Sequence, residues 1–306
     1  METELKLLLT GVNHHQLVDA LSEHGQVLKE SRHYLINQYF DTPALALRQM
    51  DIGLRVRQKG RAREQTIKTA GTSVAGIHRR PEYNLDLDGD WPDLSTFPAL
   101  VWQGADVAEL QRQLQQQFAT NFDRHAIELQ LADGTRLEVA LDQGEVLADG
   151  RSDTIDELEL ELIEGSLASA LALAQTLAKR FALRLGRASK AARGYRLAGL
   201  QPPMALETEA PLSLAQGLSA WQANESALLA GHDGARRALI TQFNTLTQAL
   251  MATEPALAMR LGALGQALVD AEDPGQRLRT LLANPGYGQV QLALLARVLE
   301  QEQEQG

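Results

Sequence analysis

Two runs of the chain alternate acidic side chains with leucines. The runs are residues 1–9 and 156–162, and their ionised alternate positions are Glu2, Glu4, Lys6, Glu157, Glu159 and Glu161. Alternate side chains of a β-strand share one face, so each run predicts a strand with one ionised and one apolar face. Carboxylates about 7 Å apart along a strand repel each other unless cations lie among them, and hard divalent metals prefer oxygen ligands. The two runs together therefore suggest a metal-assisted site.

The runs between these two place positive charges on one face in the same way. Their charged alternate positions are Arg55, Arg57, Lys59, Glu64, Lys68, Arg80, Glu82, Arg124, Glu128, Arg136, Glu138 and Asp142. Each run alone is typical of an amphipathic sheet with one face in water. The repeated use of Arg and Glu instead favours a sheet that closes into a barrel with the charges inside. Such a lumen suits a polyanion bridged to carboxylates by metal ions, because arginine binds phosphate oxygens through paired hydrogen bonds.

The bulk composition argues against several classes of protein. The 306 residues carry a formal net charge of −10, which is unlike a general nucleic-acid coat or a protein that binds anionic membranes. There is no cysteine, so there is no disulfide, thiolate metal site or cysteine nucleophile. The sequence has no run of 18 apolar residues and no basic, apolar leader. We therefore expect a cytoplasmic protein.

The periodicity predicts an α+β fold for the first 200 residues. Strands are expected near 2–9, 26–40, 52–59, 63–70, 77–87, 120–131, 135–142, 144–149 and 154–164, and helices near 13–24, 105–117, 167–181 and 188–197. Asp133-Gly134 predicts a hairpin turn, and Gln143-Gly144 predicts a turn or a bulge. Strands joined by tight turns indicate an antiparallel sheet or barrel with helices outside it.

The last hundred residues have a different composition and a different pattern of predicted elements. Residues 201–203 (QPP) predict a linker, and helices are expected near 213–230, 234–252, 255–271, 274–283 and 289–302. This tail contains six Arg, no Lys, eleven acidic residues and one histidine, His232. Polyanion affinity depends on the number of charges neutralised. We therefore expect residues 205–306 to be a packing or dimerisation unit, and not an independent polyphosphate binder.

The order of the motifs resembles a known family. Glu2-x-Glu4-x-Lys6 is similar to the ExExK signature of the CYTH superfamily, the triphosphate tunnel metalloenzymes. Further matches follow in the family's order at 39–43 (YFDTP), 53–57 (GLRVR), 66–68 (TIK), 80–84 (RPEYN), 141–145 (LDQGE), 157–161 (ELELE) and 189–195 (SKAARGY). The resemblance is closest to bacterial inorganic triphosphatases with a CYTH domain followed by a helical CHAD domain. It implies a CYTH domain over residues 1–200 and a shortened CHAD-like helical domain over 205–306.

The resemblance also implies a fold and a set of site residues. The fold is a closed, eight-stranded antiparallel β-tunnel with flanking helices. The implied ligands of Mg²⁺ or Mn²⁺ are Glu2, Glu4, Asp142, Glu159 and Glu161. The implied substrate-binding residues are Lys6, Arg55, Arg57, Lys68, Arg80, Arg124, Lys190 and Arg193. The implied catalytic set is Glu2, Glu4, Glu159, Glu161 and Lys6. Glu82 stays open between a site role and a structural role beside Arg80.

Three functions remain open at this point. The first is hydrolysis of inorganic triphosphate to phosphate and pyrophosphate, which the helical tail favours. The second is the activity of a class IV-type adenylate cyclase or a thiamine triphosphatase. The third is a non-catalytic module that binds polyphosphate or organises partners, although a pure anion binder has no need of four strand carboxylates. We expect triphosphate or another small polyphosphate as substrate, no nucleic acid or membrane partner, and a homodimer as one use of the tail.

Overall fold

The structure is a computed structural model that describes residues 2–74, 77–201, 204–209 and 211–305. Its strands form one antiparallel sheet. They are β1 (Glu2–Leu9), β2 (Gly25–Asp41), β3 (Gly53–Lys59), β4 (Ala62–Lys68), β5 (Thr72–Val74), β6 (Ile77–Arg80), β7 (Glu82–Asp86), β8 (Gln115–Leu131), β9 (Arg136–Ala148), β10 (Arg151–Glu164) and β11 (Leu183–Leu185).

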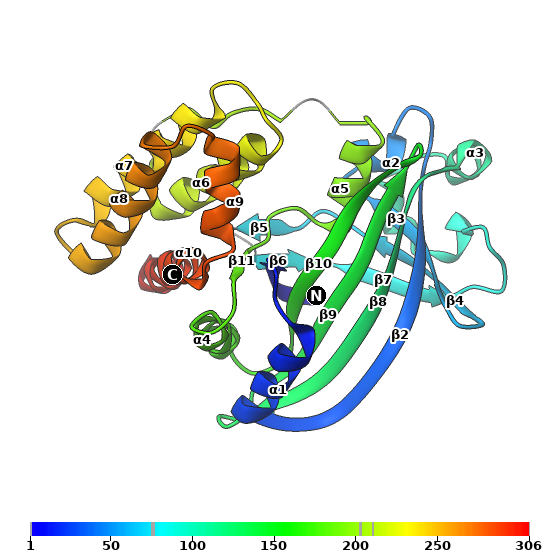
Figure 1. Ribbon diagram of the computed structural model, residues 1–306. Coiled ribbons are helices and arrows are strands. Elements are labelled where there is room, and N and C mark those ends of the chain that lie inside the picture. The colour runs from blue at the N-terminus through cyan, green and yellow to red at the C-terminus, as the bar shows by residue number, and fades with distance from the viewer. Residues whose placement is uncertain (1, 75–76, 202–203, 210, 306) are drawn as a thin grey trace.

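The sheet closes on itself through Pro81. The paired strands follow the order β5-β6-β1-β10-β9-β8-β2-β3-β4-β7, and β11 pairs with β1. β6 pairs with β1 while β7 pairs with β4, and only Pro81 separates β6 from β7. Proline has no N–H to donate to a ladder, so the predicted strand 77–87 is divided there. With β6 and β7 counted as one strand, the ring has eight strands, and Figure 1 shows it curled around an interior. The predicted eight-stranded antiparallel tunnel is confirmed.

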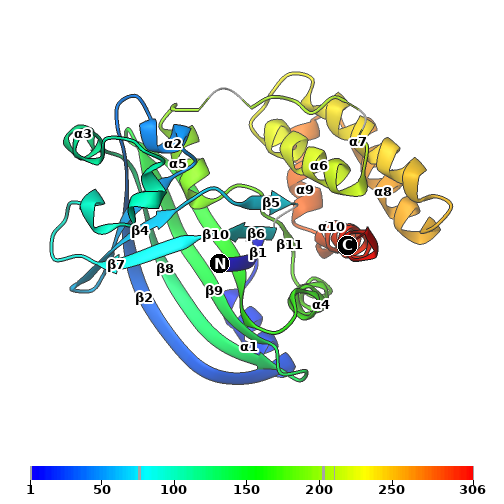
Figure 2. The same cartoon turned by 180° about the vertical axis from the view of Figure 1, so that it is seen from behind.

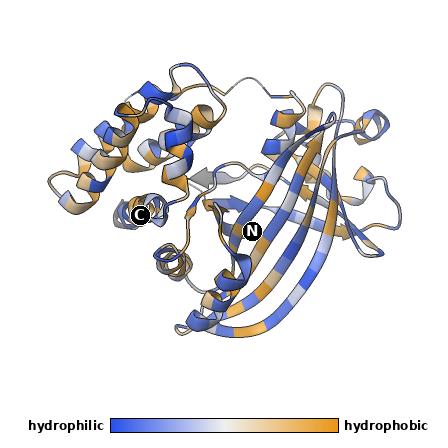
Figure 3. Cartoon of the chain, viewed as in Figure 1, coloured by the Kyte–Doolittle hydropathy of each residue, from blue (hydrophilic) through white to orange (hydrophobic). Residues whose placement is uncertain are grey.

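The two faces of the strands differ as the alternation predicts. Figure 3 shows hydrophilic and hydrophobic bands alternating along the long strands. Leucines such as Leu7 on β1 and Leu158 on β10 point outward and are fully buried in the main apolar core. The charged residues between them point inward. Burial of the apolar face sets the register, because a shift of one residue would turn every charge outward.

Five short helices accompany the tunnel. They are α1 (His14–His24), α2 (Ala46–Gln49), α3 (Val107–Gln113), α4 (Leu167–Leu177) and α5 (Lys190–Leu197), with 3-10 turns η1 (Leu94–Thr96) and η2 (Ala99–Trp102). Side chains that accept hydrogen bonds from free N–H groups cap α1, α4 and α5, and these are Asn13, Ser166 and Ser189. α5 differs from the expectation of helices outside the barrel. Its Tyr195 packs inside the tunnel with Tyr39 and Phe118.

Some predicted boundaries are wrong for local reasons. The predicted strands 135–142 and 144–149 are one strand, β9, and Gly144 lies within it. A Cβ at Gly144 would lie 2.1 Å from the carbonyl oxygen of Asn121, so the glycine permits close approach to β8 and makes no turn. The predicted helix 105–117 ends at Gln113 because β8 begins at Gln115. The sequence patterns did not predict β5, β11 or α2, which span only three or four residues.

Five further helices follow residue 211. They are α6 (Leu214–Leu229), α7 (Ala235–Leu250), α8 (Pro255–Val269), α9 (Pro274–Leu282) and α10 (Pro285–Gln305). α10 begins before the predicted 289, because proline is tolerated in the first turn of a helix. Residues 202 and 203 of the predicted linker lie outside the described residues. Among the described helices, none is long and apolar enough to cross a membrane.

The tail helices pack directly against the tunnel. Figures 1 and 2 show α10 beside α4 and β11, with α6–α9 stacked on the side of α10 away from the tunnel's centre. The main apolar core runs without interruption from Leu5 on β1 through Leu173 on α4 to Trp221 and Phe243 in the tail. The tail and the tunnel approach each other very closely at Gly288 of α10, where an added Cβ would lie 1.4 Å from the carbonyl oxygen of Leu183 on β11. The tail therefore covers apolar outer surface of the tunnel.

Candidate active site

A cavity of about 530 Å³ lies inside the tunnel and collects most of the predicted site residues. The predicted residues that line it are Glu2, Glu4, Lys6, Arg55, Arg57, Lys68, Arg80, Arg124, Glu159, Glu161 and Lys190. All except Lys190, which lies on α5, come from strands that are far apart in the sequence, and the closed ring brings these strands together. Asp142 and Arg193 do not line the cavity.

Three glutamates form a row across adjacent strands. The register pairs Glu4 on β1 with Glu161 on β10, and Glu161 with Glu138 on β9. Side chains at paired positions lie about 5 Å apart at Cβ, and like charges there are unfavourable. Burial, together with the charges of Glu138 and Glu4, raises the pKa of Glu161 to about 7. The row therefore carries more negative charge than its surroundings neutralise.

Glu2 and Glu82 share a lysine beside this row. The Nζ of Lys68 lies 2.6 Å from Glu2 and 3.0 Å from Glu82, and Arg55 lies 3.4 Å from Glu82. Burial and a hydrogen bond with Glu82 raise the pKa of Glu2 to about 7. Burial opposes ionisation of Glu82, but the hydrogen bond with Glu2 and the charges of Lys68 and Arg55 lower its pKa to about 2. Glu82 is thus part of the site and has Arg55 and Lys68, not Arg80, as its ion-pair partners.

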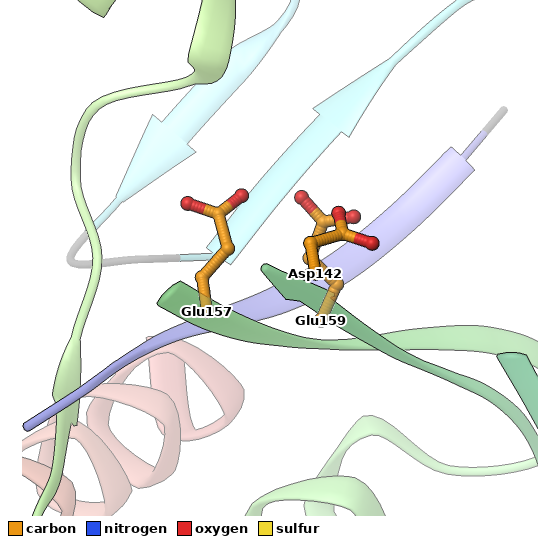
Figure 4. Close-up of side chains that lie close together, drawn as sticks. All are labelled: Asp142, Glu157 and Glu159. Atoms are coloured by element: carbon orange, nitrogen blue, oxygen red, sulfur yellow. The ribbon is translucent and has the colours of Figure 1, made fainter. Parts of the chain in front are cut away.

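A second group of carboxylates lies deeper, at the base of the cavity. Figure 4 shows Asp142, Glu157 and Glu159 side by side on β9 and β10, and one oxygen of each lies within 4.8 Å of the others. Asp142 and Glu157 are fully buried, and Glu159 is nearly so. Sequence reasoning placed Glu157 on the ionised face of its strand but did not include it among the site residues.

Lys6, Lys190 and Arg124 neutralise this deep group, and Arg193 adds a longer ion pair of 3.8 Å to Glu157. Lys6 Nζ lies 2.9 Å from Glu157 and contacts Glu159, while Lys190 Nζ lies 2.6 Å from Asp142 and also contacts Glu157 and Glu159. The other cation is Arg124, which lies 2.6 Å from Asp142 and 2.7 Å from Glu159. Buried charges are tolerated when they are paired and hydrogen-bonded.

The pairing controls ionisation in this deep group. Burial favours the neutral form of each group, yet the opposite charges outweigh it. They lower the pKa of Asp142 and of Glu159, and they raise the pKa of Lys6 and of Lys190. Asp142, Glu159, Lys6 and Lys190 therefore stay charged near neutral pH. A metal ion at this point would have to displace ammonium groups that already balance the three carboxylates.

The opposite wall of the cavity is cationic, and Arg57 lies at its centre. The Nε of Arg57 donates to Asn37 Oδ1 at 2.8 Å, and in the described part of the chain no carboxylate forms an ion pair with this guanidinium. Burial and the neighbouring charges of Arg55 and Arg124 lower the pKa of Arg57 to about 9. A cation held among cations is favourable only when an anion joins it.

Helix α5 delivers Lys190 into the site from one end of the tunnel. The helix packs so tightly that a Cβ at Gly194 would lie 2.1 Å from the ring of Phe118. Arg193, three residues after Lys190, turns away from the cavity. Its guanidinium lies 2.6 Å from Asp153 and contacts the carbonyl oxygen of Thr154. Arg193 does not line the cavity, but its guanidinium also lies 3.8 Å from Glu157, which Lys190 contacts from the cavity side.

Sequence reasoning missed Arg48, which lines the cavity from α2. Its guanidinium stacks 4.5 Å from the centre of the Tyr195 ring. Glu138 was placed on the ionised face of its strand but not assigned to the site. The signal for Glu138 was the alternation within 136–142, but its partnership with Glu161 depends on strand register. No local pattern marked Arg48, because α2 has only four residues.

The sequence also matches a known domain family and a known protein. The family model for the CYTH domain matches residues 1–195. An inorganic triphosphatase of Haemophilus influenzae is 33% identical over 204 residues, which are 65% of this chain and 56% of that protein. The match therefore spans little more than half the length of that relative.

Two solved structures are also similar. A Hippeastrum protein, described as an adenylyl cyclase with a dominant triphosphatase activity, is 21% identical, covers 66% of this chain and 98% of its own, and has a TM-score of 0.47. A Bacillus halodurans protein described as an adenylate cyclase is 20% identical, covers 61% of this chain and 91% of its own, and has a TM-score of 0.37. On the strength of the family model, which matches well over half of its length, the chain belongs to the CYTH family.

Proposed function

We propose that this protein hydrolyses inorganic triphosphate to phosphate and pyrophosphate with a divalent metal ion. The observation that carries the proposal is the separation of charge around one cavity. Neighbouring strands β1, β10 and β9 supply Glu4, Glu161 and Glu138. In the eight-strand ring β3 lies opposite β10 and β4 lies opposite β9, and these strands supply Arg55, Arg57 and Lys68. A small, highly charged anion accompanied by metal ions matches both walls.

The row of glutamates fits a divalent cation better than the deep group does. Glu138 and Glu161 form no ion pair within the described residues, and the pKa of Glu161 is raised to about 7. We assign Glu2, Glu4, Glu138 and Glu161 as the residues that would hold Mg²⁺ or Mn²⁺, both of which prefer oxygen ligands. When bound, such a cation neutralises phosphate oxygens and lowers the pKa of water.

The predicted ligands Asp142 and Glu159 receive a different role in this proposal. Arg124 and Lys190 contact both carboxylates at the base of the cavity, and Lys6 contacts Glu159. We assign them to orienting these cations, which line the base of the cavity where the substrate would bind. A preorganised cation stabilises developing charge without reorganisation during the reaction.

The remaining cations bind and align the phosphate chain. Arg55, Arg57, Lys68 and Arg80 line the same cavity as the glutamates. Water attacks the terminal phosphorus, the bond from phosphorus to the bridging oxygen breaks, and pyrophosphate leaves with that oxygen. In phosphoryl transfer the protein contributes mainly positioning and charge stabilisation. The arginine forks suit this role because they hold the phosphate oxygens in a fixed geometry.

The relative from Haemophilus influenzae supports the substrate but does not decide it. Its name states an inorganic triphosphatase, and the matched region covers 56% of its length. We propose residues 1–200 as the catalytic tunnel domain and residues 205–306 as a shortened CHAD-like helical domain. The acidic tail, with six Arg against eleven Asp and Glu from residue 205 onward, is assigned a packing role.

A panel of substrates tests the function. The full chain is assayed for phosphate release from triphosphate, ATP and thiamine triphosphate, with Mg²⁺, with Mn²⁺ and with excess chelator. We expect metal-dependent turnover that is highest on triphosphate. Higher kcat/KM on ATP, with cyclic AMP as product, or on thiamine triphosphate would replace the proposal with the corresponding enzyme. Binding of these anions without turnover under any metal would show a non-catalytic module.

A further inference from the structure

We infer that Arg48 is a specificity-determining residue, which keeps the nucleobase of a nucleoside triphosphate out of the active-site cavity. The inference rests on the proposed function and deepens it, because it limits the substrate to triphosphate that carries no base. It starts at the end of the tunnel where α2 and α5 lie close together (Figures 1 and 2). Arg48 on α2 and Tyr195 on α5 both line the cavity there.

The aromatic rings of the cavity offer no open face to a base. A protein commonly binds a nucleobase by stacking it on an aromatic ring. Among the described residues that line the cavity, the only aromatic ones are Tyr39 and Tyr195. Tyr39 stacks on Phe118 with ring centres 4.6 Å apart, and it is 7% exposed. Tyr195 meets Phe118 nearly at right angles, with ring centres 4.9 Å apart, and it is 3% exposed.

The guanidinium of Arg48 covers the ring of Tyr195. Its central carbon lies 4.5 Å from the ring centre, which is the distance of a cation–π contact. In the described part of the chain, this guanidinium forms no ion pair that would hold it elsewhere. A base could stack on the covered face only after the guanidinium had moved away. Stacking would then replace an existing contact of comparable strength, so the net gain for a nucleotide would be small.

One carboxylate holds both partners of this contact in place. Asp41 is fully buried and accepts hydrogen bonds from the backbone N–H groups of Leu47 at 2.9 Å and of Arg48 at 3.1 Å. The hydroxyl of Tyr195 donates to the same carboxylate at 3.0 Å. Hydrogen bonds to an ionised group are stronger than those between neutral groups. The start of α2 and the ring of Tyr195 are therefore fixed relative to each other, and the covered ring is built into the fold.

The same arrangement favours a bare phosphate chain. Inorganic triphosphate needs no aromatic face, so the covered ring costs it no binding energy. The guanidinium of Arg48 also adds positive charge to a cavity that already contains Arg55, Arg57 and Lys68. Arginine binds phosphate oxygens through paired hydrogen bonds. Arg48 therefore favours the unsubstituted anion over one that carries a base.

Two inhibitors that differ only in the base provide the test. Hydrolysis of triphosphate is inhibited with ATP and with ribose 5-triphosphate, which has the sugar and phosphates of ATP but no base. The inhibition constants are measured for the full chain, for Arg48→Ala and for Arg48→Lys, which keeps the charge but loses the planar group. Arg277→Ala is the matched control, because Arg277 is exposed on α9 and does not line the cavity. Melting temperatures verify that each variant is folded.

We expect Arg48→Ala to tighten inhibition by ATP about tenfold relative to inhibition by ribose 5-triphosphate, because the base can then stack on Tyr195. Arg48→Lys should change this ratio less but in the same direction, and Arg277→Ala should leave it unchanged. An unchanged ratio in the Arg48 variants would overturn the inference while leaving the triphosphatase proposal intact. Absence of triphosphate turnover in the unmodified protein would instead remove the proposed function. In that case calorimetric binding of ATP and of ribose 5-triphosphate to the same proteins still decides the role of Arg48.

Discussion

The guanidinium of Arg184 lies 2.9 Å from the carboxylate of Glu225, and this ion pair joins β11 of the tunnel to α6 of the tail. Glu225 also accepts a hydrogen bond from the hydroxyl of Tyr287 at 2.7 Å, and the backbone N–H of Leu185 donates to Gln291 at 2.9 Å. These groups are buried or nearly so, and truncation of one partner would leave the other buried and unpaired. The contact is therefore an integral part of the fold.

This contact lies one residue from the active site. The N–H of Gly186 donates to the carbonyl oxygen of Lys6 at 2.9 Å, directly after β11. The chain then reaches Ser189, the cap of α5, and Lys190. The tail thus supports the segment that carries Lys190. On this basis we expect the fragment 1–200 to be less stable than the full chain.

Substitution of Gly288 tests the packing of the tail. An added Cβ would overlap the backbone of Leu183, so we expect Gly288→Ala to lower the free energy of unfolding by about 1–3 kcal/mol or more. Gly262→Ala on α8 is the control, because its Cβ would meet nothing closer than 3.7 Å. There alanine should stabilise by about 0.5–1 kcal/mol through its higher helix propensity. Urea denaturation of both variants measures the difference, and equal effects would contradict the packing seen at Gly288.

Glu138 is expected to be a metal ligand that the sequence did not identify. Glu138→Gln should lower kcat/KM on triphosphate about a hundredfold or more, because the metal's charge and its activated water are lost together. Glu145→Gln is the matched control, since Glu145 lies on the same strand but is exposed and faces outward. Both variants should keep the melting temperature of the metal-free protein or exceed it. Wild-type kinetics in Glu138→Gln would remove this residue from the metal site.

Arg57 should bind substrate at a cost to stability. Arg57→Gln is expected to lower kcat/KM about ten- to a hundredfold, because the variant loses a charge-assisted hydrogen bond to the substrate. The same change should raise the melting temperature, because it removes a buried charge that Arg55 and Arg124 repel. Kinetics and thermal unfolding on one preparation measure both effects. A fall in stability together with unchanged kcat/KM would mean that Arg57 is a structural residue.

The pKa of Glu161 predicts how pH couples to metal binding. The pKa of the Glu161 carboxyl rises from 4.5 to about 7 on folding. Between these two pH values the folded protein therefore keeps a proton that the unfolded chain loses. The contribution of this carboxyl to stability is present below pH 4.5 and is lost as pH rises through about 7. The pKa of Glu2 rises to about 7 in the same way, but the pKa of its partner Glu82 falls to about 2. The two shifts have opposite signs, so above about pH 7 their contributions to the free energy of unfolding offset each other.

Metal ions bind the deprotonated form and should reverse this loss. We expect Mg²⁺ to raise the melting temperature more at about pH 8 than at about pH 5.5. Glu161→Gln should reduce the pH dependence of the metal-free protein's stability between about pH 5.5 and pH 8, and should also reduce the shift caused by Mg²⁺. Thermal unfolding at both pH values, with Mg²⁺ and with chelator, measures these effects. A metal-induced shift that is the same at both values would contradict the assignment of Glu161.

Local periodicity was sufficient for much of the fold. The alternation of Glu2, Glu4 and Lys6 with leucines, and the similar patterns of the other strands, specify which face of each strand is buried, because the side-chain period of a strand is two. The order of the motifs was enough to show the resemblance to the family, and that resemblance implied the closed eight-stranded tunnel. These features depend on residues close together in the chain.

Strand register and helix packing decided the features that local periodicity did not predict. The crowding of Glu138 against Glu161 exists only because β9 and β10 pair in one register. Arg193 turns to Asp153 because α5 enters the tunnel, although the sequence places it three residues from Lys190. The tail seals outer apolar surface through Gly288, which no local pattern distinguishes from other helical glycines. Such contacts join residues far apart in the sequence, so their geometry is set by the closed ring and its packing, and only the tertiary structure shows it.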